Sequence, residues 1–142
     1  MVTQRIWAFL FSCLFLSLQT VSATMLLPLG LERLHGNAEQ VFIGDCLENR
    51  VAFDAVSGRV VTYTTFQVVE ALKGKLDTTH TIKQVGGNLP DAAVVTHIAG
   101  VPQFDVGKRY LVFLPPASSI GFSSPVGLNQ GVFTVETDAT GQ

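Results

Sequence analysis

The sequence has only two cysteines, and one of them, Cys13, lies in an apolar N-terminal segment that we expect to be removed. Cys46 is then left without an intramolecular partner, so we predict no internal disulfide. Because Asp45 and Glu48 flank Cys46, nearby carboxylates are expected to raise the pKa of its thiol. Our main interpretation is a buried, unreactive side chain. A nucleophile, an interchain disulfide partner and a redox group are the alternatives.

Basic residues are also few and scattered. Outside the N-terminal segment, eight Lys and Arg face eleven Asp and Glu, which gives a net charge of −3. Only Lys73 with Lys75, and Lys108 with Arg109, lie close together, and both pairs are beside glycines in predicted turns. A polyanion needs a basic patch, so we predict that nucleic acid is not a partner.

Patterns of catalysis and metal binding are missing as well. His35, His80 and His97 do not have metal-ligand spacing. In the segment 121–125 a proline replaces the second glycine of a nucleophile elbow. Gly86-Gly87 lacks the further glycines and the helix of a phosphate loop, and predicts a turn or a bulge. Strand alternation separates Asp45 from Glu48, so no acid and base pair is expected. We therefore predict no enzyme, no cofactor and no metal.

The N-terminus has the three parts of a signal peptide. A positive charge at Arg5 precedes 13 almost entirely apolar residues at 6–18, and Val21-Ser22-Ala23 provides a cleavage site. The apolar run is too short to span a membrane, which needs about 20 residues. We predict cleavage after Ala23, a secreted or periplasmic location and no stable membrane span afterwards. A lipoprotein anchored at Cys13 is the alternative.

The remaining chain predicts one short helix followed by strands. Residues 24–40 form a lead-in, in which Leu27, Leu31 and Leu34 recur at helical spacing. From residue 41 to 142, short β-branched and aromatic runs alternate with turn residues. The predicted strands are 41–49, 59–72, 79–85, 92–98, 109–114 and 131–137. The expected fold is mainly β, a small, closed or partly closed barrel, because closure removes exposed sheet edges.

Several segments between about residues 31 and 135 resemble the netrin-like module shared with tissue inhibitors of metalloproteinases, and look most like small secreted bacterial proteins of that type. The segments that carry the likeness are 41–44, 64–68, 72–74, 86–87 and 106–114. The resemblance implies a Greek-key β-barrel of the oligonucleotide/oligosaccharide-binding (OB) type. In the animal inhibitors an N-terminal cysteine chelates the protease zinc. The predicted first residue here is Thr24, so that role is not transferred.

We expect a non-catalytic, exported protein-binding module, whose partner is a protein such as a peptidase or an envelope component. The contact surface is predicted in the loop 115–129, with Phe122 exposed at its tip, and in the segment 86–90. The candidate contact residues are Phe122, Ser123, Ser124, Asn88 and Leu89. A barrel that binds a saccharide or a small apolar ligand is the alternative, and a small hydrolase that uses Cys46 or a histidine is a further one.

The C-terminus predicts a further element. Residues 131–136 are typical of a strand, and Asp138-Ala139-Thr140-Gly141 has the composition of a hairpin turn. A turn of this kind leads into a returning strand, so we expect the chain to continue beyond Gln142. A frayed tail is the alternative.

Overall fold

The computed structural model describes residues 28–89 and 94–136. The predicted signal peptide and the predicted hairpin turn at residues 138–141 lie outside this range. The elements, in chain order, are α2 (Leu31–Asn37), β1 (Gln40–Asp54), β2 (Arg59–Lys73), β3 (Thr79–Val85), β4 (Gly87–Leu89), β5 (Val94–Thr96), β6 (Arg109–Leu114), the 3-10 helix η2 (Leu128–Gly131) and β7 (Val132–Thr134). The described chain is therefore mainly β with one short α-helix, as predicted. None of the helices in these two ranges has both the length and the apolar character needed to cross a bilayer.

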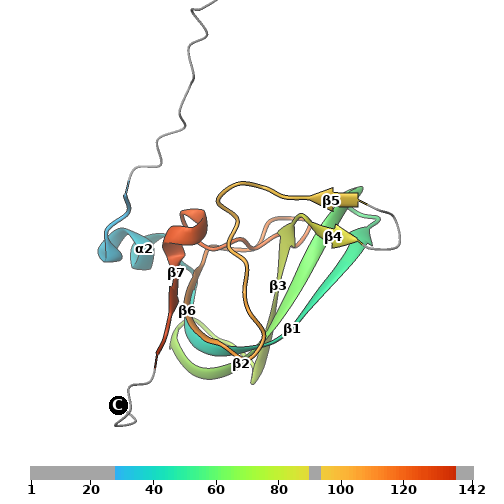
Figure 1. Cartoon of the computed structure of the whole chain (residues 1–142). Coiled ribbons are helices and arrows are strands. Elements are labelled where there is room, and N and C mark those ends of the chain that lie inside the picture. Colours follow the sequence, from blue (N-terminus) through green and yellow to red (C-terminus); the bar gives the residue numbers. More distant parts are fainter. Residues whose placement is uncertain (1–27, 90–93, 137–142) are drawn as a thin grey trace, which may run out of the picture.

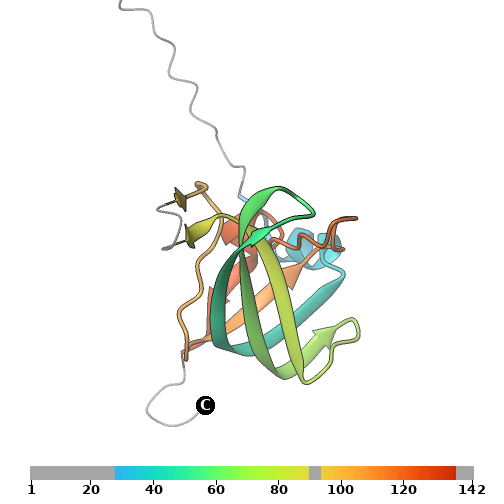
Figure 2. The same cartoon turned by 90° about the vertical axis from the view of Figure 1, so that its right-hand side faces the viewer.

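The strands form one large and one small antiparallel sheet. The large sheet has the order β3-β2-β1-β6-β7, and β4 pairs with β5 in the small one. The irregular pairing of β1 with β2, with register shifts after Val41, Ile43 and Cys46, bends the hairpin, since a bulge increases local twist. Figure 2 shows β1, β2 and β3 curving together, and Figure 1 places β4 and β5 at the opposite end of the molecule from α2.

The concave side of the large sheet holds an aromatic core. The rings of Phe66 and Phe104 meet edge to face with 5.0 Å between their centroids, as do those of Phe104 and Tyr110. Each such pair contributes about 0.5–1.5 kcal/mol beyond the area that it buries. The buried members of this core are Phe42, Cys46, Phe66, Ile82, Phe104, Tyr110, Val112 and Leu114.

A second, smaller core lies on the opposite side of β1 and β6 and holds α2. Leu34 and Ala38 pack there with Val41, Phe113 and Val126. The prediction that the strand at 109–114 is covered on both sides is thus confirmed, because Val112 belongs to one core and Phe113 to the other. Of the leucines that predicted the helix, Leu34 is buried but Leu31 is 64% exposed.

Most predicted strands are confirmed, with changes at their ends. Strand β3 has the predicted bounds and so does β6, whereas β1 continues five residues further, to Asp54. The predicted strand 92–98 is reduced to Val94–Thr96 within the described residues, and 131–137 to Val132–Thr134. The turn or bulge predicted at Gly86-Gly87 was only partly right, since Gly87 begins a strand, β4, that the pattern did not predict.

Closure into a barrel is not seen as strand pairing. In the described part of the chain, β3 and β7 are the two ends of the large sheet and do not pair with each other. The loop between β6 and β7 does reach the free edge of β3, where the Ser123 N–H donates to the Lys83 carbonyl over 3.0 Å.

Candidate functional site

The concave face of the sheet changes from apolar to polar along its strands. On β2, Phe66 is followed on the same face by Thr64 and Thr62, because alternate residues of a strand share a face. On β3, Ile82 pairs with Thr64 and Gln84 pairs with Thr62. The aromatic core therefore ends at Phe66, and hydroxyl and amide side chains continue the same inner face toward β4.

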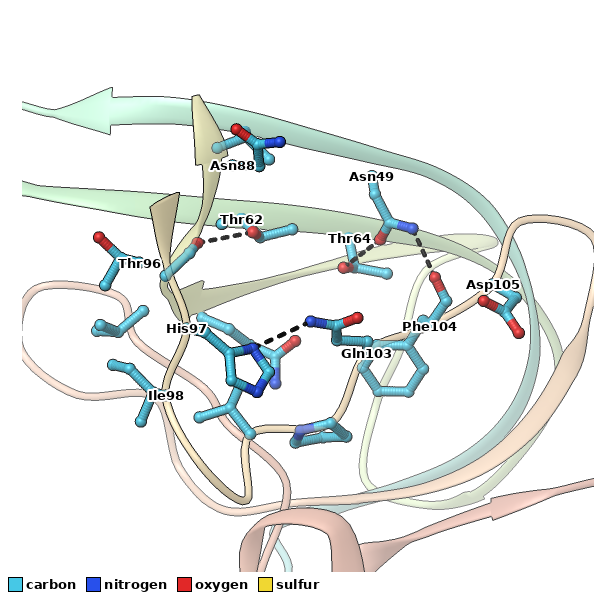
Figure 3. Close-up of a pocket in the computed structure, with 17 residues that line it drawn as sticks. Asn49, Thr62, Thr64, Asn88, Thr96, His97, Ile98, Gln103, Phe104 and Asp105 are labelled. Atoms are coloured by element: carbon cyan, nitrogen blue, oxygen red, sulfur yellow. Dashed lines mark hydrogen bonds between the residues drawn. The ribbon is translucent and has the colours of Figure 1, made fainter. Parts of the chain in front are cut away.

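A cavity of about 280 Å³ lies over this polar part of the face. Strands β1, β2 and β3 line it on one side, and the segment from Thr96 to Asp105 lines it on the other (Figure 3). The residues that line it are Asn49, Val51, Thr62, Thr64, Gln84, Val85, Gly86, Gly87, Asn88, Thr96, His97, Ile98, Val101, Pro102, Gln103, Phe104 and Asp105. Its volume is near the lower end of the range for small-molecule sites, about 300–1,000 Å³.

Hydrogen bonds fix the wall made by residues 96–105 to the sheet. Asn49 is central, because its Nδ2 donates to the Phe104 carbonyl over 2.6 Å while its Oδ1 accepts from the Thr64 hydroxyl over 2.6 Å (Figure 3). The Phe104 ring, which is buried in the aromatic core, holds the same end of the wall. Further along, the Asn129 N–H of η2 donates to the Gly100 carbonyl over 3.1 Å, so this part of the wall is held by η2 instead of the sheet.

Gly86 and Gly87 let the backbone turn tightly beside the cavity. Their φ angles are +102° and +138°, which side chains rarely adopt. A Cβ on Gly86 would lie 2.7 Å from the Thr96 carbonyl oxygen, and one on Gly87 would lie 2.7 Å from Thr62 Oγ1. The Thr62 hydroxyl donates to the Gly86 carbonyl over 2.8 Å. Glycine at both positions thus brings β4 and β5 against the inner face of the sheet.

Little charge faces the cavity. Asp105 lies at one end of the lining, and its carboxylate accepts from Lys108 Nζ over 2.7 Å; this hydrogen bond raises the pKa of Lys108. His97 is exposed, and its Nδ1 lies 3.5 Å from Gln103 Nε2. The remaining polar side chains of the lining are amides and hydroxyls.

A buried ion pair joins β1, β3 and the loop 115–127. Lys83 Nζ donates to Asp54 Oδ2 over 2.8 Å and to the Ile120 carbonyl over 3.0 Å, and it lies 4.7 Å from the centre of the Phe122 ring. Hydrogen bonds from Lys83, and then from Ser57, hold the pKa of Asp54 well below its usual range. Sequence reasoning missed this cluster, because Lys83 and Asp54 belong to different strands.

Three of the predicted contact residues are not exposed as expected. The expectation that Phe122 is exposed at a loop tip is wrong, since its ring is half-buried over the Lys83 ammonium group. Ser123 is buried at the edge of β3, and Ser124 is half-buried. The loop folds back on the sheet instead of projecting from it, because the Lys83 side chain and carbonyl both bond it.

Asn88 and Leu89, the other predicted contact residues, lie on β4. Asn88 is exposed and lines the cavity. Leu89 lines a separate groove with Phe53 and Ile98. Neither lining includes Phe122, so the two predicted contact segments do not form one described site.

Cys46 is buried in the aromatic core, which confirms its interpretation as a small apolar side chain. Burial is the main reason that the pKa of its thiol is raised, and the charge of Asp105 adds to the effect. The neighbouring acids that suggested this shift are not its cause. The Asp45 carboxylate instead accepts two hydrogen bonds from Arg109, over 2.7 and 2.9 Å, and they lower its pKa.

The three histidines do not come together. His35 is exposed on α2, His97 lies at the cavity, and His80 is half-buried with its ring 5.7 Å from that of Phe42. Burial lowers the pKa of His80. Within residues 28–89 and 94–136, no group of three or more His, Cys, Asp or Glu side chains is placed to hold a metal ion.

Comparison with known proteins does not place the chain in a family. No family model matches it, and neither a curated protein nor a solved structure does.

Proposed function

We propose that this chain is an exported, non-catalytic binding protein that holds a small uncharged ligand in the cavity between the large sheet and the segment 96–105. The observation that carries the proposal is the lining of the cavity, in which amide and hydroxyl side chains stand beside apolar ones and no Lys or Arg is present. Among the described residues, the buried Nε2 of Gln84 on this face has no hydrogen-bond partner, which is unfavourable if the face serves packing alone.

The charge of the lining supports the choice of ligand class. No Lys or Arg belongs to it, and its one carboxylate, that of Asp105, is paired with Lys108. An ion would lose its hydration in such a cavity without gaining a countercharge, which makes its binding unfavourable. An uncharged molecule loses less hydration free energy, and the amides and hydroxyls of the wall can replace its hydrogen bonds to water.

The bonding of the hydroxyls supports a non-catalytic role. Thr62 donates its proton to the Gly86 carbonyl, and Thr64 donates its proton to Asn49 Oδ1. A nucleophilic hydroxyl needs a base as its hydrogen-bond acceptor. The raised pKa of Cys46 keeps this thiol protonated near neutral pH, so it is a poor nucleophile as well.

We infer that the fold is an OB-type Greek-key barrel of the netrin-like kind. Support comes from β1, which is long, bent by bulges and paired with both β2 and β6. The hydrogen bond from the Ser123 N–H to the Lys83 carbonyl joins the β6 to β7 loop to the free edge of β3. A barrel of this kind closes at that edge.

The test is a titration of 15N-labelled residues 24–142, followed by NMR. The uncharged probes are acetamide, glucose and cyclohexanol; acetate, matched in shape to acetamide, and methylammonium are the charged controls. We expect at least one uncharged probe to shift the amide signals of Gln84, Asn88 and Gln103, and neither ion to do so. Binding of the ions alone, or of no uncharged probe, would refute the proposal.

A protein partner is the second candidate, and an apolar surface at the tip of the β1 to β2 hairpin favours it. Phe53 and Val56 are 62% and 73% exposed, and Phe53 lines the groove shared with Leu89 and Ile98. Exposed apolar surface of this kind is typical of interaction sites. The check is capture from an envelope fraction with the wild-type chain and with Phe53→Ser. A partner that binds both equally does not use this surface.

A further inference from the structure

Gln84 carries a buried amide whose Nε2 is unpaired among the described residues. The residue is 3% exposed, lies on β3 and lines the cavity. Its Nε2 is buried and, among the described residues, has no hydrogen-bond partner. A buried donor of this kind is rare in folded proteins, because it loses its bonds to water without replacing them.

The polar neighbours of Gln84 are already engaged with one another. Thr62 donates to the Gly86 carbonyl, Thr64 to Asn49, and Asn49 to the Phe104 carbonyl. This network holds the cavity wall in place without the amide of Gln84. The Gln84 Nε2 donor takes no part in this network, although its residue lines the cavity.

Two further carboxamides lie around the same cavity. Asn88 reaches it from β4 and Gln103 from the segment 96–105, and both are exposed (Figure 3). Each amide group offers donors and an acceptor, and so does each sugar hydroxyl. Val101 and Pro102 add apolar surface to the lining, which suits the C–H faces of a sugar ring.

We propose that the ligand is a neutral saccharide, and that Gln84 Nε2 donates a hydrogen bond to one of its oxygens inside the cavity. Asn88 and Gln103 bind hydroxyls at the opening. This inference rests on the proposed function and narrows its ligand class. A purely apolar ligand would leave the Gln84 donor unpaired, and an ion would lack a countercharge.

The test compares three chains spanning residues 24–142: the wild type, Gln84→Met and Gln67→Met. Methionine keeps the length of the side chain and removes the amide. Gln67 is the matched control, because it is exposed on β2 and its Nε2 donates to the Thr78 carbonyl, away from the cavity. Each chain is titrated with glucose, N-acetylglucosamine and cyclohexanol, and its thermal unfolding is recorded without ligand.

We expect saccharide binding to weaken about tenfold or more in Gln84→Met, because a hydrogen bond of typical strength is lost, and to stay unchanged in Gln67→Met. The unfolding midpoint of Gln84→Met without saccharide should be equal to or higher than that of the wild type, since an unpaired buried amide is removed. A residue with a merely structural role would lower the midpoint instead.

Three results would count against this inference in different ways. If the wild type binds cyclohexanol but neither saccharide, the ligand class is wrong and the proposed function stands. If Gln84→Met binds the saccharides as tightly as the wild type, Gln84 is not the donor. If no uncharged probe binds the wild type, both proposals fail. Should Gln84→Met not fold, the NMR signal of the Gln84 side-chain amide in the wild type tests the inference instead. A saccharide that binds must shift this signal, and an unchanged signal would mean that Gln84 is not the donor.

Discussion

Replacing Phe104 by alanine tests whether the wall of the cavity depends on the aromatic core. The Phe104 ring is 4% exposed and meets the rings of Phe66 and Tyr110 edge to face, each with 5.0 Å between centroids. Burial of a phenylalanine side chain contributes about 1.5–3 kcal/mol. Each of the two ring pairs adds about 0.5–1.5 kcal/mol. We therefore expect Phe104→Ala to lower the free energy of unfolding by about 3–5 kcal/mol, as Phe to Ala changes in cores do.

That loss is a large part of the total, since domains of this size are stable by about 5–15 kcal/mol. For residues 24–142 it corresponds to a fall in Tm of about 10–20 °C. Urea and thermal unfolding followed by circular dichroism measure both quantities. The control is Phe53→Ala, whose ring is 62% exposed and for which we expect a loss below about 1 kcal/mol. Equal losses in the two variants would refute the argument that Phe104 anchors the wall.

Three other perturbations have a defined direction. The pKa of Asp54 is lowered by Lys83, so in acid the unfolded chain binds more protons than the folded chain does. The stability that this ion pair contributes is therefore complete above about pH 4 and falls as the pH drops. This contribution should disappear in Asp54→Asn, whose urea midpoint will vary less between pH 2 and 5. Cys46 should react slowly with a thiol reagent in native protein and quickly in denaturant, and equal rates would contradict its burial. Gly87→Ala should lower the free energy of unfolding, measured in urea, by about 1–3 kcal/mol, because residue 87 has a φ of +138° and its Cβ would meet Thr62. Gly58→Ala is the control, since there is open space around Gly58, and its free energy of unfolding should fall by less.

Local patterns were sufficient to predict most strands. On β2, alternation placed Phe66 and Val68 on one face and Thr65 and Gln67 on the other. Phe66 is buried, Val68 packs against the core and Gln67 is exposed, whereas Thr65 is half-buried. On β6, an apolar run without alternation predicted burial on both faces, which the two cores explain. These predictions worked because side-chain period and burial are both properties of a single strand.

Strand β4 could not be predicted in the same way. Three residues are too few to show alternation. Gly87 also has a φ of +138°, which the strand propensities of side chains do not predict. Pairing with β5 defines the strand, and this pairing depends on where the chain returns after a loop. The pattern at Gly86-Gly87 therefore indicated the bend correctly and the strand not at all.

The cavity left a signal in the sequence that was not used. Thr62 and Thr64 share the parity of Phe66 on β2, and Gln84 shares that of Ile82 on β3, so polar residues occupy inward positions on two neighbouring strands. This combination predicts a polar interior at one end of the sheet. The contact between Lys83 and Asp54 left no such signal, because the fold alone brings the two together.

Strand β1 also determines the order in which the chain can fold. Its pairing with β2 closes through a short turn, whereas its pairing with β6 joins Gln40 to Leu114. Distant contacts form late, since closing a long loop costs more entropy, and folds rich in them need milliseconds to seconds. Because a chain is synthesised N-terminus first, the hairpin of β1 and β2 must wait with one edge open until Arg109–Leu114 has left the ribosome. An exposed edge of this kind pairs readily with other chains. A chaperone that covers this edge should therefore improve the yield of folded protein more than one that acts on the finished fold.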